Sequence, residues 1–104
     1  GNFNTAQVTE MEEMFWGSSS LINLDLSNFD TSQVVNMSSM FGVCRKLTNL
    51  DFRNATFTTV TMYSSMFEFV PSTIQVIVKD STAQSWIQDK LGSGVGTVTI
   101  APTV

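Results

Sequence analysis

Residues 29–54 read FDTSQVVNMSSMFGVCRKLTNLDFRN, and this stretch decides the fold because it recurs along the chain. Moved back by 26 residues, it aligns with FNTAQVTEMEEMFWGSSSLINLDLSN at residues 3–28. Moved forward by the same interval, it aligns with a weaker third copy that keeps Val60, Ser64, Ser65, Met66 and Phe67. A fixed period of this length is typical of proteins built from stacked repeats.

The first half of each copy has the spacing of a helix. In residues 29–54 the apolar side chains are 3, 3, 1 and 3 positions apart, which describes one face of an α-helix. They are Val34, Met37, Met40, Phe41 and Cys44, and their counterparts are Val8, Met11, Met14 and Phe15 in copy one and Val60, Tyr63, Met66 and Phe67 in copy three. The pattern predicts one short helix in each repeat, with candidate N-cap oxygens at residues 30–32. Since about ten residues are too few for an isolated helix, packing must hold it.

The second half of each copy has the spacing of a strand. Its apolar side chains follow the pattern L-x-x-L-x-L and are Leu21, Leu24 and Leu26 in copy one and Leu47, Leu50 and Phe52 in copy two. Such a strand pairs with its equivalent in the next repeat at about 4.8 Å, which makes a parallel sheet. We expect Leu24 and Leu50 to be neighbours on adjacent strands. Asn28 and Asn54 end the strand segments and are expected to bind backbone groups at the turn.

These patterns predict an α/β repeat fold. We expect a leucine-rich-repeat-like solenoid over residues 1–80, with a short parallel sheet and one short helix for each 26-residue repeat. Alternation of Ile74, Val76 and Val78 predicts a last strand there. Residues 81–104 are expected to form a capping helix and strand of the same domain, with the helix starting at a capping box on Ser81 and ending at Gly92. Trp86 is expected to plug the apolar end of the stack.

The methionines and the cysteine are interpreted as core residues. All six methionines fall in the predicted repeat helices, and at helical spacing beside valine and phenylalanine they are expected to face inward. Cys44 aligns with Ser18 and Val70, which predicts a small buried side chain rather than a reactive thiol. A single cysteine also excludes an internal disulfide.

Composition excludes several classes of function. The net charge is −4 and the five basic residues are scattered, which argues against nucleic-acid binding. No apolar run is long enough for a membrane span. The chain has no histidine, so it lacks the commonest general base and the commonest metal ligand. Zinc is excluded on the same ground, and no loop of the calcium-binding type is present. We predict no cofactor and no enzymatic activity.

The stretch LINLDLSNFDTSQVVNMSSMFGVCRKLTNLDF, residues 21–52, resembles the BspA-type leucine-rich repeats of bacterial surface proteins. Those repeats read L-x-x-L-D-L-S-x-F-D-T-S-x-V-x-N-M-x-x-M-F, and the resemblance covers residues 3–78. It implies display outside the cell and a role in adhesion or protein interaction, and it implies no catalytic residues.

The predicted outer face of the sheet is the candidate binding surface. It carries Asn23, Asp25, Asn49, Asp51 and Arg53. Asp25 and Asp51 should stack one repeat apart, and Arg53 lies on the same face, where it could neutralise the pair. Trp16 is expected to project outward, because its equivalents are Gly42 and Glu68; it would either contact a partner or cover the neighbouring repeat.

Three interpretations of function remain open at this point. The first is an adhesion or interaction module that binds a protein partner, such as a host or extracellular-matrix protein, through the sheet face. The second is a carbohydrate-binding module, and the third is a structural spacer. Self-association is a further expectation, because the first repeat has no polar cap before it and repeat stacks need capped ends.

Overall fold

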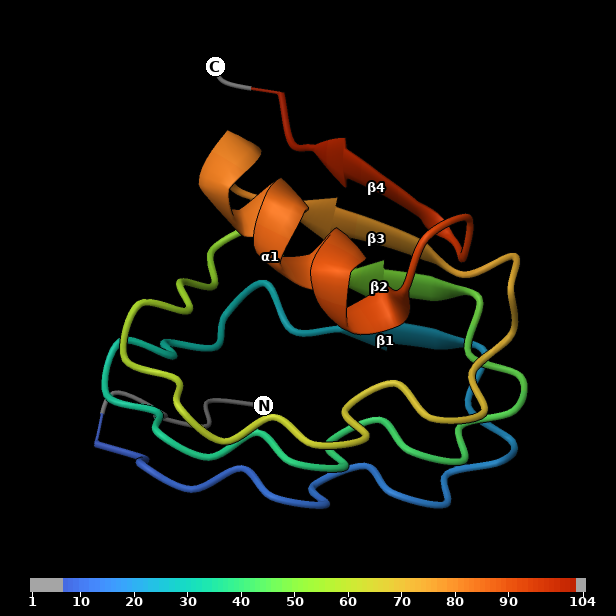
Figure 1. Cartoon of the computed structure of the whole chain (residues 1–104), viewed down its shortest axis with the longest axis horizontal. Coiled ribbons are helices and arrows are strands. Elements are labelled where there is room, and N and C mark those ends of the chain that lie inside the picture. The colour runs from blue at the N-terminus through green and yellow to red at the C-terminus, as the bar shows by residue number, and fades with distance from the viewer. Residues whose placement is uncertain (1–6, 103–104) are drawn as a thin grey trace.

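The computed structural model describes residues 7–102 and contains four strands and one helix. The strands are β1 (Asn23–Asp25), β2 (Asn49–Asp51), β3 (Gln75–Val78) and β4 (Thr97–Ile100), and the helix is α1 (Ser81–Leu91). All neighbouring strands are parallel, in the order β1-β2-β3-β4 (Figure 1). The fold is a small α/β domain.

The register of the sheet follows the 26-residue period. Leu24 pairs with Leu50, and Leu50 pairs with Val76, so equivalent positions of successive repeats lie side by side. This confirms the predicted neighbours. We call residues 7–28, 29–54 and 55–80 coil 1, coil 2 and coil 3. Figure 1 shows them stacked, with the strands along one side and the segments that precede the strands along the other.

The predicted repeat helices are wrong. The described part of residues 7–80 contains no helix; the first half of each coil is a series of turns, named here the turn segments, residues 10–18, 36–44 and 62–70. Within a turn segment, N–H groups bond carbonyls three residues back, as in Met40 to Met37 at 3.2 Å and Cys44 to Phe41 at 3.3 Å. Because these bonds alternate with bonds to the next coil, the backbone cannot wind into a continuous helix.

A ladder of backbone hydrogen bonds joins the turn segments. Every second N–H of one coil donates to a carbonyl of the next coil. From coil 1 to coil 2 the bonds run from Met11 to Asn36, Glu13 to Ser38, Phe15 to Met40 and Gly17 to Gly42, at 2.8, 3.0, 2.9 and 2.9 Å. From coil 2 to coil 3 they run from Met37 to Met62, Ser39 to Ser64, Phe41 to Met66 and Val43 to Glu68, at 2.7, 2.8, 2.9 and 2.6 Å. Each interface therefore has four such bonds in one direction.

The turns also require left-handed backbone at two positions in each coil. Positive φ occurs at Glu13 and Gly17, at Ser39 and Val43, and at Ser65 and Phe69. In a type II turn the third of the four turn residues has a positive φ, which glycine adopts without strain. Gly17 is the favourable case, with φ 75°, whereas its β-branched equivalent Val43 has φ 60°. Strain of about 1–3 kcal/mol at such a position persists only where surrounding contacts impose it, and here the ladder does so.

The apolar stripe of coil 2 is buried even though its backbone is not helical, whereas Tyr63, predicted to belong to the stripe of coil 3, is 42% exposed. Val34, Met37, Met40, Phe41 and Cys44 are all fully buried. Turns that close over three residues return the chain to the same side at nearly the spacing of a helix, so one sequence pattern suits both structures. Equivalent phenylalanines then stack: Phe15 on Phe41 with centroids 5.8 Å apart, and Phe41 on Phe67 at 5.2 Å.

The methionines follow the prediction only in part. Met11, Met37, Met40 and Met66 are buried, and Met14 is partly buried. Met62 is 51% exposed, so the expectation that all six face inward is wrong. Met62 occupies the position of Asn36 in coil 2, which belongs to the ladder and not to the stripe.

Polar residues at the coil corners join the coils as well. The predicted N-cap residue Thr31 is buried and bridges to coil 3: its hydroxyl donates to the Thr56 carbonyl at 2.7 Å and accepts from the Thr56 N–H at 2.9 Å. The predicted role of Asn54 is confirmed, since its amide donates to the Ser27 carbonyl at 2.6 Å. Cys44 is fully buried, as predicted, and its thiol donates to the Phe15 carbonyl at 3.1 Å.

The C-terminal helix is confirmed over residues 81–91, but its cap differs from the prediction. Asp80 is the N-cap, and its side chain accepts a hydrogen bond from the Ala83 N–H at 2.9 Å. Ile87 is the fully buried residue of α1, whereas Trp86 is only partly buried. Ile87 therefore seals the core, and Trp86 lies at its edge. Among residues 7–102, no helix has the length and apolar character needed to cross a bilayer.

The difference in burial between Met40 and Met62 predicts that their substitution by alanine will have unequal effects on stability. Met40→Ala should lower the free energy of unfolding by about 2–5 kcal/mol, because it leaves a cavity between coils. Met62→Ala should change it by less than about 0.5 kcal/mol, because its side chain is half exposed. Urea denaturation of both variants measures the difference, and equal losses would contradict the burial described here.

Candidate functional site

The outer face of the sheet brings together the five polar residues predicted to lie there. Asn23, Asn49 and Gln75 form one column across β1, β2 and β3, because the register places them opposite one another. All three are exposed. The Asn49 amide donates to the Asn23 side-chain oxygen at 2.7 Å, so the two carboxamides are already ordered. The column presents amide donors and acceptors at the spacing of the strands, about 4.8 Å.

A second column contains the acidic residues. Asp25 pairs with Asp51, and Asp51 with Ile77, along the same face. Arg53 binds Asp51: its Nε lies 3.0 Å from both carboxylate oxygens, and the closest terminal nitrogen is 2.9 Å from Oδ2. This bond to Asp51 raises the pKa of the Arg53 guanidinium. Arg53 therefore neutralises Asp51 by direct contact, and Asp25 keeps its charge in solvent.

Asp25 is held as a carboxylate by its own turn. Hydrogen bonds from the side chain and the N–H of Ser27 lower the pKa of Asp25, and the positive charge of Arg53 adds to the effect. The N–H bond is 2.9 Å long. A general acid would need the opposite shift. The two aspartates are thus suited to accept hydrogen bonds and to attract cations or basic groups.

The face is slightly concave. A shallow depression crosses all four strands and is lined by the two polar columns, with Gln75 and Thr99 at its C-terminal end. Ile77 is partly buried and supplies an apolar patch between them. Among the residues that the structure describes, no group of three or more acidic, cysteine or histidine side chains could hold a metal ion.

Trp16 lies apart from this face. It belongs to the turn segment of coil 1, on the side of the stack away from the strands. Its ring lies over Gly42, where a β-carbon would come within 2.9 Å of the indole Cδ1. Trp16 nevertheless remains 54% exposed. The indole therefore packs on the neighbouring coil and still presents a large apolar surface to solvent.

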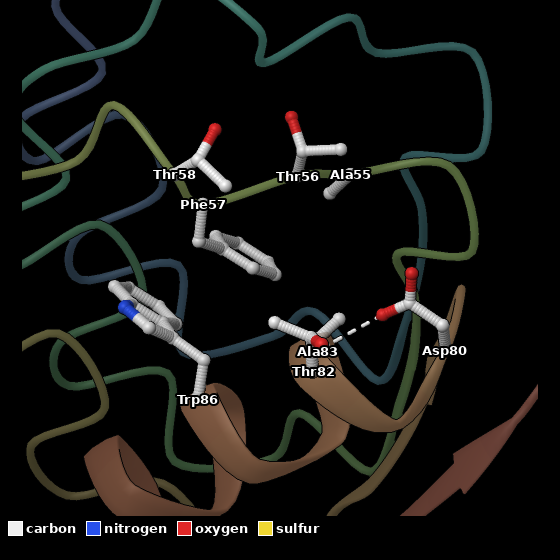
Figure 2. Close-up of a pocket in the computed structure, with 8 residues that line it drawn as sticks. All are labelled: Ala55, Thr56, Phe57, Thr58, Asp80, Thr82, Ala83 and Trp86. Atoms are coloured by element: carbon white, nitrogen blue, oxygen red, sulfur yellow. Dashed lines mark hydrogen bonds between the residues drawn. The ribbon is translucent and has the colours of Figure 1, made fainter.

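A second concave site, which the sequence did not predict, lies between α1 and coil 3. Figure 2 shows Phe57 and Trp86 on one side of it and Asp80 on the other. The two rings are parallel, and their centroids are 4.3 Å apart. The cleft has a volume of about 320 Å³. Lys90 lies 4.9 Å from the centroid of the Trp86 ring. Phe57 and Lys90 therefore both contact the Trp86 ring, which is already engaged within the chain.

A comparison with protein families supplies the identification. A family model described as "Mycoplasma protein of unknown function, DUF285" matches residues 1–86. The chain belongs to this family. No curated protein and no solved structure gave a significant match. The DUF285 match includes all six predicted binding residues and ends within α1, so the sheet face lies inside the family region and β4 lies outside it.

The Asp25 geometry predicts a pH dependence for this DUF285 chain. A lowered folded-state pKa contributes stability above the unfolded value, about 3.9, and that contribution disappears as the pH falls through the folded-state value. Asp25→Asn should therefore be less stable than the unchanged chain above about pH 5, and the difference should shrink below about pH 4. Thermal unfolding of both chains between about pH 2 and about pH 7 measures this difference. A difference that does not vary with pH would contradict the assignment.

The contact of Trp16 with Gly42 predicts coupling between these positions. Gly42→Ala should cost about 1–3 kcal/mol, because the new methyl group collides with the indole. In a Trp16→Ala background the same change should be close to neutral. Urea denaturation of the two single variants and the double variant gives the coupling energy. If Gly42→Ala costs the same in both backgrounds, the clash with Trp16 is not the cause.

Proposed function

We propose that this chain is a non-catalytic interaction module of a bacterial surface protein, a stretch of leucine-rich-repeat-like solenoid that binds protein partners through its exposed sheet face. The observation that carries the proposal is the pair of ordered polar columns on that face. The resemblance of residues 3–78 to BspA-type repeats supports an extracellular, adhesive role. Function is argued here from the site, since a repeat fold alone is compatible with many functions.

The face offers what a polar protein surface needs for recognition. Exposed carboxamides of Asn23, Asn49 and Gln75 can each donate and accept, and the Asp25 carboxylate can accept from a basic side chain. Ile77 adds a small apolar centre. Because the strands fix the backbone and the bonds between Asn49 and Asn23 and between Arg53 and Asp51 restrict the side chains, binding would cost little ordering entropy.

The same face is poorly suited to catalysis. General acid–base chemistry needs a group whose pKa lies near the working pH, usually through burial. Asp25 is exposed and its pKa is lowered, and Asp51 is paired with Arg53. A carbohydrate-binding role is the alternative, supported by the carboxamides and carboxylates. It ranks second because sugar sites use an open aromatic face, and no aromatic side chain is among the described residues that line the depression on the sheet face.

The proposal is tested by comparing two charge-matched variants. Asp25→Asn, Asp51→Asn and Arg53→Gln together change the sheet face, whereas Glu12→Gln, Glu68→Gln and Arg45→Gln remove the same charges from exposed positions elsewhere. Binding of both to a panel of purified extracellular-matrix proteins should be measured by biolayer interferometry, with a glycan array run in parallel. We expect the first variant to bind at least about tenfold more weakly, since 1.4 kcal/mol is tenfold, and the second to bind as the unchanged chain does.

Three results would contradict the proposal. Protein binding that survives the sheet-face variant would exclude this face. Binding to glycans alone would favour the carbohydrate-binding role. The absence of binding to either, while a longer polypeptide binds through other domains, would favour a spacer.

A further inference from the structure

The cleft between α1 and coil 3 is separate from the sheet face. Figure 2 shows that its lining comes from residues 55–58 of coil 3 on one side and from Asp80 and α1 on the other. It shares no lining residue with the depression on the sheet face. Its volume of about 320 Å³ lies at the lower end of the range of ligand pockets, roughly 300–1,000 Å³. The cleft therefore has room for one side chain or a small molecule.

One side of α1 supplies an acid, a small residue and an aromatic ring. Asp80, Ala83 and Trp86 follow one another at intervals of three residues, which places them on the same side of the helix. At 1.5 Å for each residue, Asp80 and Trp86 are roughly 9 Å apart along the axis. Ala83 lies between them and is buried. The cleft thus has a negative charge at one end, an aromatic ring at the other, and a methyl group between.

The Asp80 carboxylate has no cationic partner among residues 7–102, where both ion pairs involve other aspartates. Its Oδ1 accepts the N–H of Ala83, and Oδ2 accepts no hydrogen bond from these residues. The N-terminus of α1 carries about half a positive elementary charge, which offsets only part of the carboxylate. The net charge of −4 on the chain also attracts cations. The cleft is therefore complementary to a cation that has an apolar body.

The geometry of the cap favours an ammonium over a guanidinium. A guanidinium binds most strongly when it can donate to both oxygens of a carboxylate, whereas the lysine ammonium is a point charge on a flexible four-carbon stem. Because Oδ1 of Asp80 already caps α1, only Oδ2 is left for a ligand. The apolar lining from Ala83, Phe57 and Trp86 suits the aliphatic stem.

We propose that this cleft binds the side chain of a lysine on a protein partner, with the ammonium at Asp80 and the stem against Ala83, Phe57 and Trp86. The proposal goes beyond the sheet face and does not depend on it. The two surfaces are tested separately, because the triple variant of the sheet face leaves every residue of the cleft unchanged.

The experiment uses Nα-acetyl-lysine N-methylamide as the probe. It is titrated into the full chain labelled with nitrogen-15, and the indole N–H resonances are followed by NMR and assigned with Trp16→Phe. We expect the Trp86 resonance to shift with a Kd on the order of 1–10 mM, as suits one exposed charge and a small apolar contact, and the Trp16 resonance to stay in place. The norleucine analogue, which lacks the ammonium, should bind about two- to fivefold more weakly.

Three variants locate the site. Asp80→Asn removes the charge and keeps the cap, since asparagine caps helices as well as aspartate does; it should bind the lysine probe only as well as the unchanged chain binds the norleucine analogue. Glu12→Gln removes the same charge from an exposed position in coil 1 and should leave the affinity unchanged. Thr82→Phe, at an exposed position in the cleft wall, should abolish the shift because the ring fills the cleft.

Four results would overturn the proposal. One is the absence of a saturable shift of the Trp86 resonance, and another is equal affinity for the norleucine analogue. A shift that survives Thr82→Phe would place the binding elsewhere, and an equal loss of affinity in Glu12→Gln would show that only the net charge matters. If n-butylamine binds and the lysine probe does not, the occupant is a free amine and not a lysine of a protein.

Discussion

The structure depends on a ladder of backbone hydrogen bonds between successive turn segments, which joins residues 25 positions apart, as in Met11 to Asn36. At each interface four ladder bonds run from the earlier coil to the later one, and bonds such as Val35 N–H to the Thr9 carbonyl run the other way; together they hold the coils and the strands opposite in register. The short strands could not do this alone, because three residues form few bonds. The ladder also explains why left-handed backbone is kept at Val43, where a β-branched side chain is unfavourable.

Once the coils are in register, each side chain lies beside the equivalent side chain of the next coil. Phe15, Phe41 and Phe67 stack through all three coils, and the methionines of the stripe fill the space beside them. On the other face of the sheet the same rule stacks asparagine on asparagine and aspartate on aspartate. A buried core and a polar sheet face thus arise from one period. Like charges brought together in this way need a partner, which Arg53 supplies to Asp51.

The two ends of the stack differ in how their apolar surface is treated. At the C-terminal end α1 lies over the core with Ile87 fully buried, and the pair of Phe57 and Trp86 joins the helix to coil 3. At the N-terminal end the face of coil 1 keeps its phenylalanine and leucines partly exposed. On the side of the stack, the Trp16 ring covers Gly42. The equivalent positions in coil 1 and coil 3 are Trp16 and Glu68, so only coil 2 has no side chain there.

The sequence by itself determined the period, the pairing of Leu24 with Leu50, the inward stripe, the polar sheet face and the bounds of α1, because each depends on spacing and residue type alone. The tertiary structure decided that the stripe lies on turns and not on a helix, since both place apolar groups at similar intervals and only the partner of each N–H distinguishes them. It also decided which residues of the last coil are exposed, such as Met62, and that Arg53 binds Asp51 directly. These features depend on contacts between residues that are distant in the sequence, and a local sequence pattern does not contain that information.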